Sequence, residues 1–309
     1  MSAKQRSRAV DFLVYVAVRV FVCIAQALSF ETAAMFARWF AWIIYKFDKR
    51  HRLVAVENLQ KSFPGQLTDA EIDRLVRHVY LFFCTMVVEI LFMPRKLRVH
   101  NYKRSIVLVN PCLLADIILR DGPKIIVTGH FGNWEMSAYA LAMFGVRLHA
   151  IDRPLDNPYV DDFLRAFRER TGQKLLAKSE DIAQIESVVA AAGVLGIVGD
   201  QDAGQRGVFV DFFGRPASTH KGMAVLSLQH HAPIIVCGMP RIDGMYRITP
   251  IDVIDPADYA SVPDAVRVIT QRFTAGLERL VRATPEQYFW VHRRWKHAPA
   301  KRRTRAAAA

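Results

Sequence analysis

The chain has 309 residues, a formal net charge of +13 and a hydrophobic content of 52%. This length can bury a large core, in one domain or in two small ones. Nucleic-acid-binding proteins are commonly basic but less hydrophobic, so the composition favours an anionic membrane surface and acidic partners over nucleic acid. The four cysteines have no paired spacing, which argues against a disulfide framework or a zinc site.

The N-terminal region, residues 1–52, is predicted to be a membrane anchor. The apolar stretch 9–30 is long enough to span a bilayer. Three polar residues interrupt it: Asp11, Arg19 and Gln26. The next stretch, 33–47, is too short to span but is rich in Trp and Phe, which is typical of a helix in the membrane interface. A signal peptide cleaved near residue 28 is the alternative, which Arg19 disfavours. We expect a retained anchor, either spanning or half-buried.

Residues 53–299 are predicted to form one α/β domain, followed by a basic and Ala-rich tail at 300–309. A capping box at Thr68 and Glu71 opens a long helix that we expect to end near Met93. Strands are then expected at 106–109, 125–128, 146–151, 174–177, 194–199 and 233–238. Helices are expected between them at 113–120, 133–144, 157–171, 179–192 and 219–231. This alternation predicts a mostly parallel sheet flanked by helices, completed by an added edge strand at 246–254 and a helix at 263–283.

The stretch 124–135, KIIVTGHFGNWE, carries the candidate catalytic residues. His130 follows the C-terminal end of a predicted strand, where open α/β sheets place their chemistry. Asn133 is expected to cap the next helix, which puts Glu135 in the first helical turn. The turn between them lets the carboxylate fold back and hold the imidazole, as an acid orients a general base. Taken as a bare pattern, such a pair is more often a surface pair or a satisfied core pair.

Other polar residues follow other predicted strands. Arg153 is interpreted either as an anion clamp or as a turn residue paired with Asp152. Arg170 is a weaker candidate clamp. Asp200 and Gln201 follow the strand at 194–199; a further aspartate is close by, but no His or Cys stands at ligand spacing, so a metal site is the least favoured interpretation.

The segment HFGNWE resembles the His-(four residues)-acid motif of the bacterial lipid A biosynthesis acyltransferases, the lauroyl/myristoyl transferase family, within the glycerolipid acyltransferase superfamily. The C-terminal segment 285–299 is by itself typical of an interfacial amphipathic segment. It also resembles the Trp-x-His-x-Arg-aromatic signature that ends this family. The similarity runs in order from about Asn58 to Pro299. Its other members here are Asn58-Leu59, Phe63-Pro64, Asp200-Gln201, Phe212-Phe213-Gly214, Ala217-Ser218-Thr219 and Ala232-Pro233.

The resemblance implies roles for individual residues. It makes His130 the general base and Glu135 its orienting acid, with backbone N–H groups near Asn133 stabilising the oxyanion. It places Asp200 and Gln201 on the acceptor side and favours a functional Arg153. Phe212 and Phe213 then flank the acyl pocket, although they can equally be ordinary core.

The resemblance also implies substrates and a location. The donor would be acyl-carrier protein or acyl-CoA, and the acceptor a Kdo-bearing lipid A precursor at the cytoplasmic face of the inner membrane. It implies no metal or redox cofactor. The basic residues at 46–52 and 293–305 are expected to meet anionic lipids or the acidic carrier protein. Two alternatives stay open: an acyltransferase for phosphatidylinositol mannoside or another glycolipid, and a catalytically silent membrane-binding homologue. The intact pair of His130 and Glu135 speaks against the second.

Overall fold

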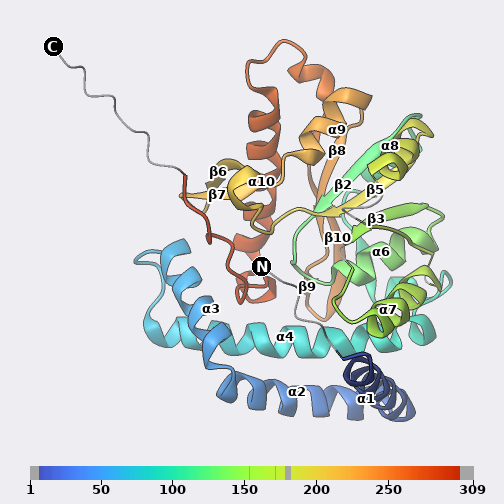
Figure 1. The fold of residues 1–309 in the computed structure, drawn as a ribbon, viewed down its shortest axis with the longest axis vertical. Coiled ribbons are helices and arrows are strands. Elements are labelled where there is room, and N and C mark those ends of the chain that lie inside the picture. Colours follow the sequence, from blue (N-terminus) through green and yellow to red (C-terminus); the bar gives the residue numbers. More distant parts are fainter. Residues whose placement is uncertain (1–6, 153, 171, 178–181, 300–309) are drawn as a thin grey trace.

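A mixed sheet forms the centre of this computed structural model, which describes residues 7–152, 154–170, 172–177 and 182–299 (Figure 1). The strand order is β1-β10-β8-β2-β5-β3-β4, and β9 pairs with β10. The strands are β1 (Ile106–Leu108), β2 (Lys124–Thr128), β3 (Leu148–Asp152), β4 (Lys174–Ala177), β5 (Val194–Val198), β8 (Ile234–Gly238), β9 (Arg241–Ile242) and β10 (Met245–Ile254). The neighbours from β8 to β4 are all parallel, which confirms the predicted mostly parallel sheet.

Helices cover both faces of this sheet. On one face lie α5 (Pro111–Leu119), α6 (Trp134–Met143) and α7 (Pro158–Arg170), and on the other α8 (Ile182–Ala190), α9 (Gly222–His230) and α10 (Ala265–Ala283). Side chains alternate along β2, so Ile126 packs against Leu141 of α6, whereas Ile125 joins Phe273 of α10 in the other core. Both faces are therefore apolar, as expected for a parallel sheet.

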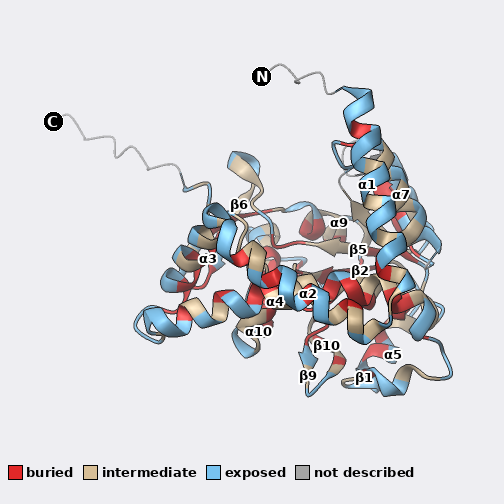
Figure 2. Ribbon diagram, turned by 90° about the horizontal axis from the view of Figure 1, so that it is seen from below, coloured by how far each residue is buried: buried red, intermediate tan, exposed pale blue. Residues whose placement is uncertain are grey.

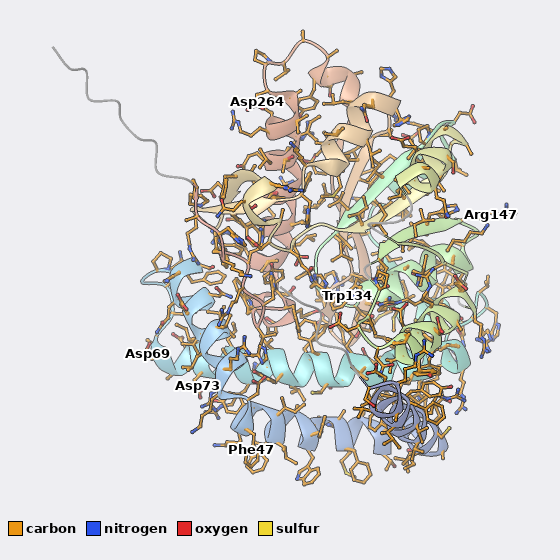
Figure 3. The ribbon with its side chains drawn as sticks, viewed as in Figure 1. Phe47, Asp69, Asp73, Trp134, Arg147 and Asp264 are labelled. Atoms are coloured by element: carbon orange, nitrogen blue, oxygen red, sulfur yellow. The ribbon has the colours of Figure 1, made fainter. Side chains whose placement is uncertain are left out.

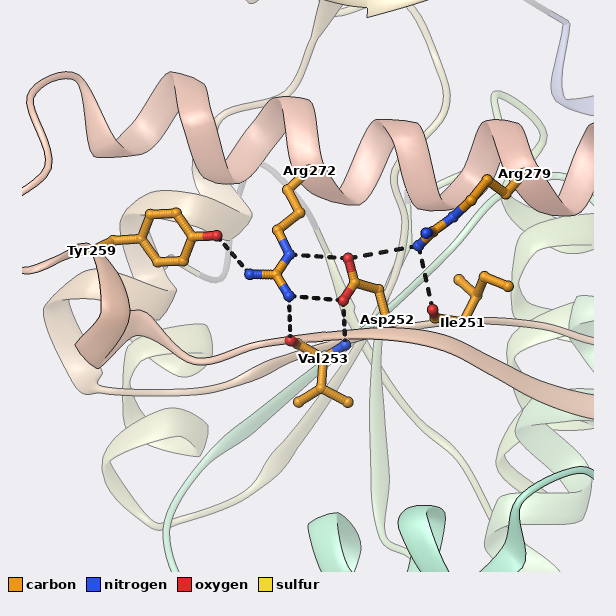
Figure 4. Close-up of polar contacts among 6 residues, drawn as sticks. All are labelled: Ile251, Asp252, Val253, Tyr259, Arg272 and Arg279. Carbon is orange, nitrogen blue, oxygen red and sulfur yellow. Dashed lines mark hydrogen bonds and ion pairs between the residues drawn. The ribbon is translucent and has the colours of Figure 1, made fainter.

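The expectation of an edge strand at 246–254 is wrong for residues 246–248, which pair with β1 on the far side from β8. Residues 249–254 pair with β8, with a shift of register between Pro250 and Asp252. Asp252 on β10 accepts two hydrogen bonds from the guanidinium of Arg272 on α10, at 2.9 and 3.0 Å, and Arg272 also donates to the hydroxyl of Tyr259 at 2.7 Å (Figure 4). These bonds fix α10 against β10.

A second small sheet was not predicted. β6 (Val208–Phe212) and β7 (Arg215–Thr219) form an antiparallel hairpin outside the main sheet. The stretch 217–219 was expected to lead directly into a helix. It is instead paired backbone, and α9 begins three residues later.

Four helices precede the sheet: α1 (Arg8–Ala27), α2 (Phe30–Phe47), α3 (Lys49–Ser62) and α4 (Asp69–Lys96). α2 packs along α4 below the sheet in Figure 1. The predicted capping box at Thr68 is present, whereas α3 was not predicted as a helix. The opposite side of α2 is open to solvent, and Figure 3 shows Phe47 projecting from it.

α1 is apolar on its outward side and polar where it meets the protein. Asn157, which immediately precedes α7, donates to the carbonyl oxygen of Asp11 at 2.9 Å, and the guanidinium of Arg19 lies 5.1 Å from the ring centroid of Phe163. Gln26 donates to a backbone carbonyl of α4. The three polar residues that interrupt the apolar stretch therefore face the protein, and most of the helix is exposed (Figure 2). By length and composition, α1 and α4 are each able to cross a membrane; α4 is the more buried of the two.

Candidate active site

His130 stands in a loop of fixed shape between β2 and α6. Gly132 in this loop has a φ of 59°, and a Cβ there would lie 2.2 Å from the carbonyl oxygen of Met239, so only glycine fits. Its N–H donates to the carbonyl of Gln287 at 2.9 Å. Asn133 caps α6 as predicted, accepting the backbone N–H three residues on at 3.0 Å.

Asp200 holds the imidazole of His130. The ring Nδ1 lies 2.7 Å from one carboxylate oxygen, and the backbone N–H of His130 donates to the other at 2.9 Å. Asp200 is 2% exposed and lies two residues after the end of β5, the strand beside β2. A Cβ on Gly129 would lie 3.3 Å from the carboxyl carbon of Asp200, so the glycine permits this close approach.

The contact between His130 and Asp200 raises the pKa of the imidazole and lowers the pKa of the carboxyl group. Burial alone would lower the pKa of His130, but the charge of Asp200, its hydrogen bond and the charge of Glu135 together raise the pKa above its usual value. Burial would raise the pKa of Asp200, but the attraction and hydrogen bonds of His130 hold that pKa well below its usual range. Asp200 therefore remains ionised and favours the charged imidazolium.

The other ring nitrogen of His130 points to the reaction space. Because Nδ1–H donates to Asp200, Nε2 is the acceptor in the neutral ring, and the amide nitrogen of Gln201 lies 3.4 Å from it. Trp134 packs edge-on against the imidazole, with ring centroids 5.1 Å apart, and Phe289 lies on another side at 6.1 Å. Nε2 is thus the basic atom that a substrate can reach.

Glu135 is engaged by an arginine that sequence analysis missed. Its two carboxylate oxygens accept hydrogen bonds from Arg168 of α7, at 2.5 and 3.0 Å. The same guanidinium binds Asp152, at the end of β3, at 2.6 Å. Glu135 thus acts on His130 through its charge, while the hydrogen bond to the imidazole comes from Asp200. The arginines of α7 repeat at helical spacing, which offered a signal for one of them facing the strand ends.

A pocket of about 550 Å³ lies beside His130, between the sheet and the helices α6 and α7. Several polar side chains meet at the polar end, by the strand ends, among them His130, Glu135, Asp152, Arg168 and Gln201. Apolar side chains, including Ile126, Leu141, Leu148, Ile197 and Leu175, form much of the rest of the lining, and Ser137 and Gln173 are polar members of it. The pocket follows β3 from Asp152 to Leu148, a length of about 13 Å at the rise of a strand. The pocket thus extends from a polar reaction end along a mixed lining in which apolar side chains predominate in number.

The remaining candidate residues from the sequence do not line the pocket or lie outside the described part of the chain. Arg153 lies outside the described residues. Arg170 is exposed at the end of α7 and does not line the pocket. Phe212 and Phe213 are buried against Tyr288 and Trp290, so of the two interpretations the ordinary core is correct. Within the described ranges, no group of three or more His, Cys, Asp or Glu residues is placed to hold a metal ion.

The C-terminal segment is a buried support of the site, and the interfacial interpretation is wrong. Trp290 is fully buried, and its carbonyl accepts the side-chain N–H of Asn58 at 2.8 Å. Arg294 is 1% exposed and donates to the carbonyl oxygen of Ser218 and the hydroxyl of Thr219, at 2.5 and 2.6 Å. The signature residues thus tie α3 and the β6–β7 hairpin to the segment that carries Phe289.

Two further contacts explain details of the same region. The carbonyl oxygen of His130 accepts the N–H of Phe289 at 3.0 Å, so the segment contacts the catalytic loop directly. Asp202, the extra acid near Asp200, binds the imidazole of His297 at 2.6 Å. Pro233 immediately precedes β8, which is parallel to β2. It therefore lies at the opposite end of these strands from His130 and does not line the site.

Comparison with known proteins shows the family of this chain. The model of the bacterial lipid A biosynthesis acyltransferase family matches residues 3–297. The chain belongs to this family. One relative of this acyltransferase, the lipid A biosynthesis acyltransferase of Haemophilus influenzae, is 25% identical over 256 residues, which cover 81% of this chain and 77% of the relative. Another, the lipid A biosynthesis lauroyltransferase of Escherichia coli K12, is 28% identical over 182 residues, or 57% and 56% of the two chains.

Among solved structures, the acyltransferase aligns with the 1-acyl-sn-glycerophosphate acyltransferase of Thermotoga maritima. The alignment covers 82% of this chain and 98% of that one, with 13% identity and a TM-score of 0.34.

Proposed function

We propose that this acyltransferase moves a fatty acyl group from a carrier thioester to a hydroxyl of a glycolipid, with His130 as the general base. The observation that carries the proposal is the fixed orientation of the imidazole: Asp200 binds Nδ1, and Nε2 faces the pocket. A base held in this way can take the proton of a hydroxyl placed within hydrogen-bond reach. Asp200, more than Glu135, has the position of the orienting acid.

The proposed reaction has two steps. Nε2 removes the hydroxyl proton as the oxygen attacks the thioester carbonyl, which forms a C–O bond and an oxyanion. The oxyanion then collapses, the C–S bond breaks, and the imidazolium returns its proton to the leaving thiolate. Asp200 and Glu135 stabilise the imidazolium between these steps. The N–H groups of Trp134 and Glu135, in the first turn of α6, are the donors that we assign to the oxyanion.

The pocket and the N-terminal helices support the choice of substrates. The apolar side chains along the pocket suit the transferred acyl chain. The outward sides of α1 and α2 expose Val, Phe and Trp side chains, which suits a membrane surface. We assign the donor to acyl-carrier protein or acyl-CoA and the acceptor to a Kdo-bearing lipid A precursor at the cytoplasmic face of the inner membrane.

Mass spectrometry of the lipid A fraction tests this assignment in cells. Cells that contain the protein should hold lipid A that is heavier by one saturated acyl group than cells that lack it, and His130→Ala should fail to restore the mass. If the lipid A spectrum is unchanged and cells without the protein instead lose an acyl group from phosphatidylinositol mannoside, that glycolipid is the acceptor.

A further inference from the structure

A second, apolar pocket lies among the N-terminal helices. It has a volume of about 580 Å³ and is enclosed by α1, α2 and α4. Among the described residues, its lining is wholly apolar apart from the thiol of Cys84; Ile24, Ala33, Phe40, Ile44 and Phe83 are members of this lining. No part of the reaction proposed above uses it.

This N-terminal pocket shares a wall with the reaction pocket. Phe83 of α4 lines the N-terminal pocket, and its ring lies 5.9 Å from that of Trp134 and 5.0 Å from that of Phe289. Trp134 lines the reaction pocket and packs on the imidazole of His130. Figure 3 shows Trp134 between the sheet and α4. A layer of aromatic rings therefore separates the two pockets beside the catalytic base.

The other side of the N-terminal pocket opens on the exposed apolar surface. Five of its lining side chains are each more than half exposed: Phe21, Ile24, Phe36, Trp39 and Phe40. They come from α1 and α2, and the exposed arginines near the middle of these helices, Arg19 and Arg38, do not line the pocket. A hydrocarbon chain can pass from a membrane in contact with this surface into the pocket without crossing a polar rim.

We propose that the N-terminal pocket binds an acyl chain that the acceptor glycolipid already carries. This inference rests on the proposed function, since it requires an acylated acceptor. The acceptor resides in the membrane, so its chain arrives from the apolar surface, whereas the donor chain arrives on a water-soluble carrier and enters at the polar end of the reaction pocket. With one chain in the N-terminal pocket, the sugar hydroxyl is held at the aromatic wall, beside Nε2 of His130.

Photo-cross-linking tests the site without turnover. The probe is a Kdo-bearing lipid A precursor with a diazirine in its acyl chains, mixed with the His130→Ala protein, and the labelled peptides are identified by mass spectrometry. Labels on α1, α2 and α4 around Cys84, displaced by the unlabelled precursor, are expected. Labels confined to α6 and β3 would overturn the inference, as would labels displaced equally by plain phospholipid. Because the assay needs no catalysis, it measures where the glycolipid chain binds separately from whether acyl transfer occurs.

Steady-state kinetics test the same site in the active enzyme. Cys84→Trp fills the pocket and should raise KM for the long-chain acceptor at least tenfold, with kcat and KM for the donor unchanged. Transfer to an acceptor analogue with short chains should be unaffected, which also shows that the variant is folded. Met35→Trp adds the same ring to the exposed side of α2 without lining the pocket, and it should behave as the unmodified enzyme. A changed donor KM or chain-length preference, or no change in either KM, would contradict the proposal.

Discussion

Asp200 holds His130 at two points, by the ring Nδ1 at 2.7 Å and by the backbone N–H at 2.9 Å. The two residues are 70 positions apart in sequence and come from the ends of neighbouring parallel strands. This contact fixes both the rotation of the imidazole and the tautomer with a basic Nε2. The buried carboxylate at the site thus follows β5, and the motif glutamate is bound to Arg168.

Asp200→Asn should lower kcat/KM by about 10²-fold or more, because an amide cannot stabilise the imidazolium. The pKa of His130 is raised above its usual value, so activity should fall as the pH drops through this raised pKa and protonates the base. Removal of the negative charge lowers this pKa, so the acid limb of the kcat/KM profile should move to lower pH. Asp202→Asn, which removes the partner of His297, is the matched control and should leave the limb in place. An acid limb that does not move in Asp200→Asn would contradict the pairing.

Glu135→Gln and Arg168→Gln should each reduce kcat/KM, and the double variant should lose much less than the two losses combined. The reason is that each residue alone leaves a partly buried charge without its main partner. We expect a coupling of about 1–3 kcal/mol in a double-mutant cycle. Glu135→Asp keeps the charge and should retain more activity than Glu135→Gln. Losses that simply add would show that the two residues act independently.

Arg294→Met should lower the free energy of unfolding by about 1–3 kcal/mol, since it leaves buried oxygen acceptors near Ser218 and Thr219 without their donors. The adjacent Arg293 is exposed and serves as the control: Arg293→Ala should change the free energy by less than about 0.5 kcal/mol. Denaturant titration of both variants measures the difference. Equal free energies of unfolding for Arg294→Met and Arg293→Ala would show that Arg294 does not support the C-terminal segment as described.

Transfer from acyl-carrier protein should slow with rising salt, mainly through association, because the carrier is acidic and this chain is basic. Arg293 and Lys296 are exposed and available for docking, whereas Arg294 is buried and is not. Arg293→Glu should therefore reduce kcat/KM with the carrier, but not with a short thioester analogue. If salt affects both donors alike, the carrier does not dock through charge.

The features of this protein that could be predicted are those that depend on local sequence. The strand, turn and helix around His130 follow from the β-branched run before it and the N-cap Asn133 after it, and the parallel sheet follows from the alternation of elements. The place of β10 could not be predicted in this way. It depends on pairing with β1, more than 130 residues earlier in the chain, which no local pattern encodes.

The same limit applies to the site. His130 and Glu135 were found by their spacing, but the contact between His130 and Asp200 arises because β2 and β5 are neighbours in the sheet. Arg168 carries no local sign of its role beyond its helical spacing. The residues of the C-terminal signature suggested a membrane surface because aromatic and basic residues alternate there. Their burial depends on the β6–β7 hairpin and on Asn58, which lie far away in sequence.

The most direct test of the central claim is acyl transfer by the purified enzyme, measured by the mass of the product. Given acyl-carrier protein bearing a saturated medium-length chain and a Kdo-bearing lipid A precursor, the enzyme should yield the precursor heavier by one ester-linked acyl group. His130→Ala should remain folded and lose about 10²–10⁴-fold in rate. Near-normal transfer by folded His130→Ala would contradict the proposed mechanism. An unmodified precursor, with acylation of a mannosylated phosphatidylinositol instead, would contradict the proposed acceptor.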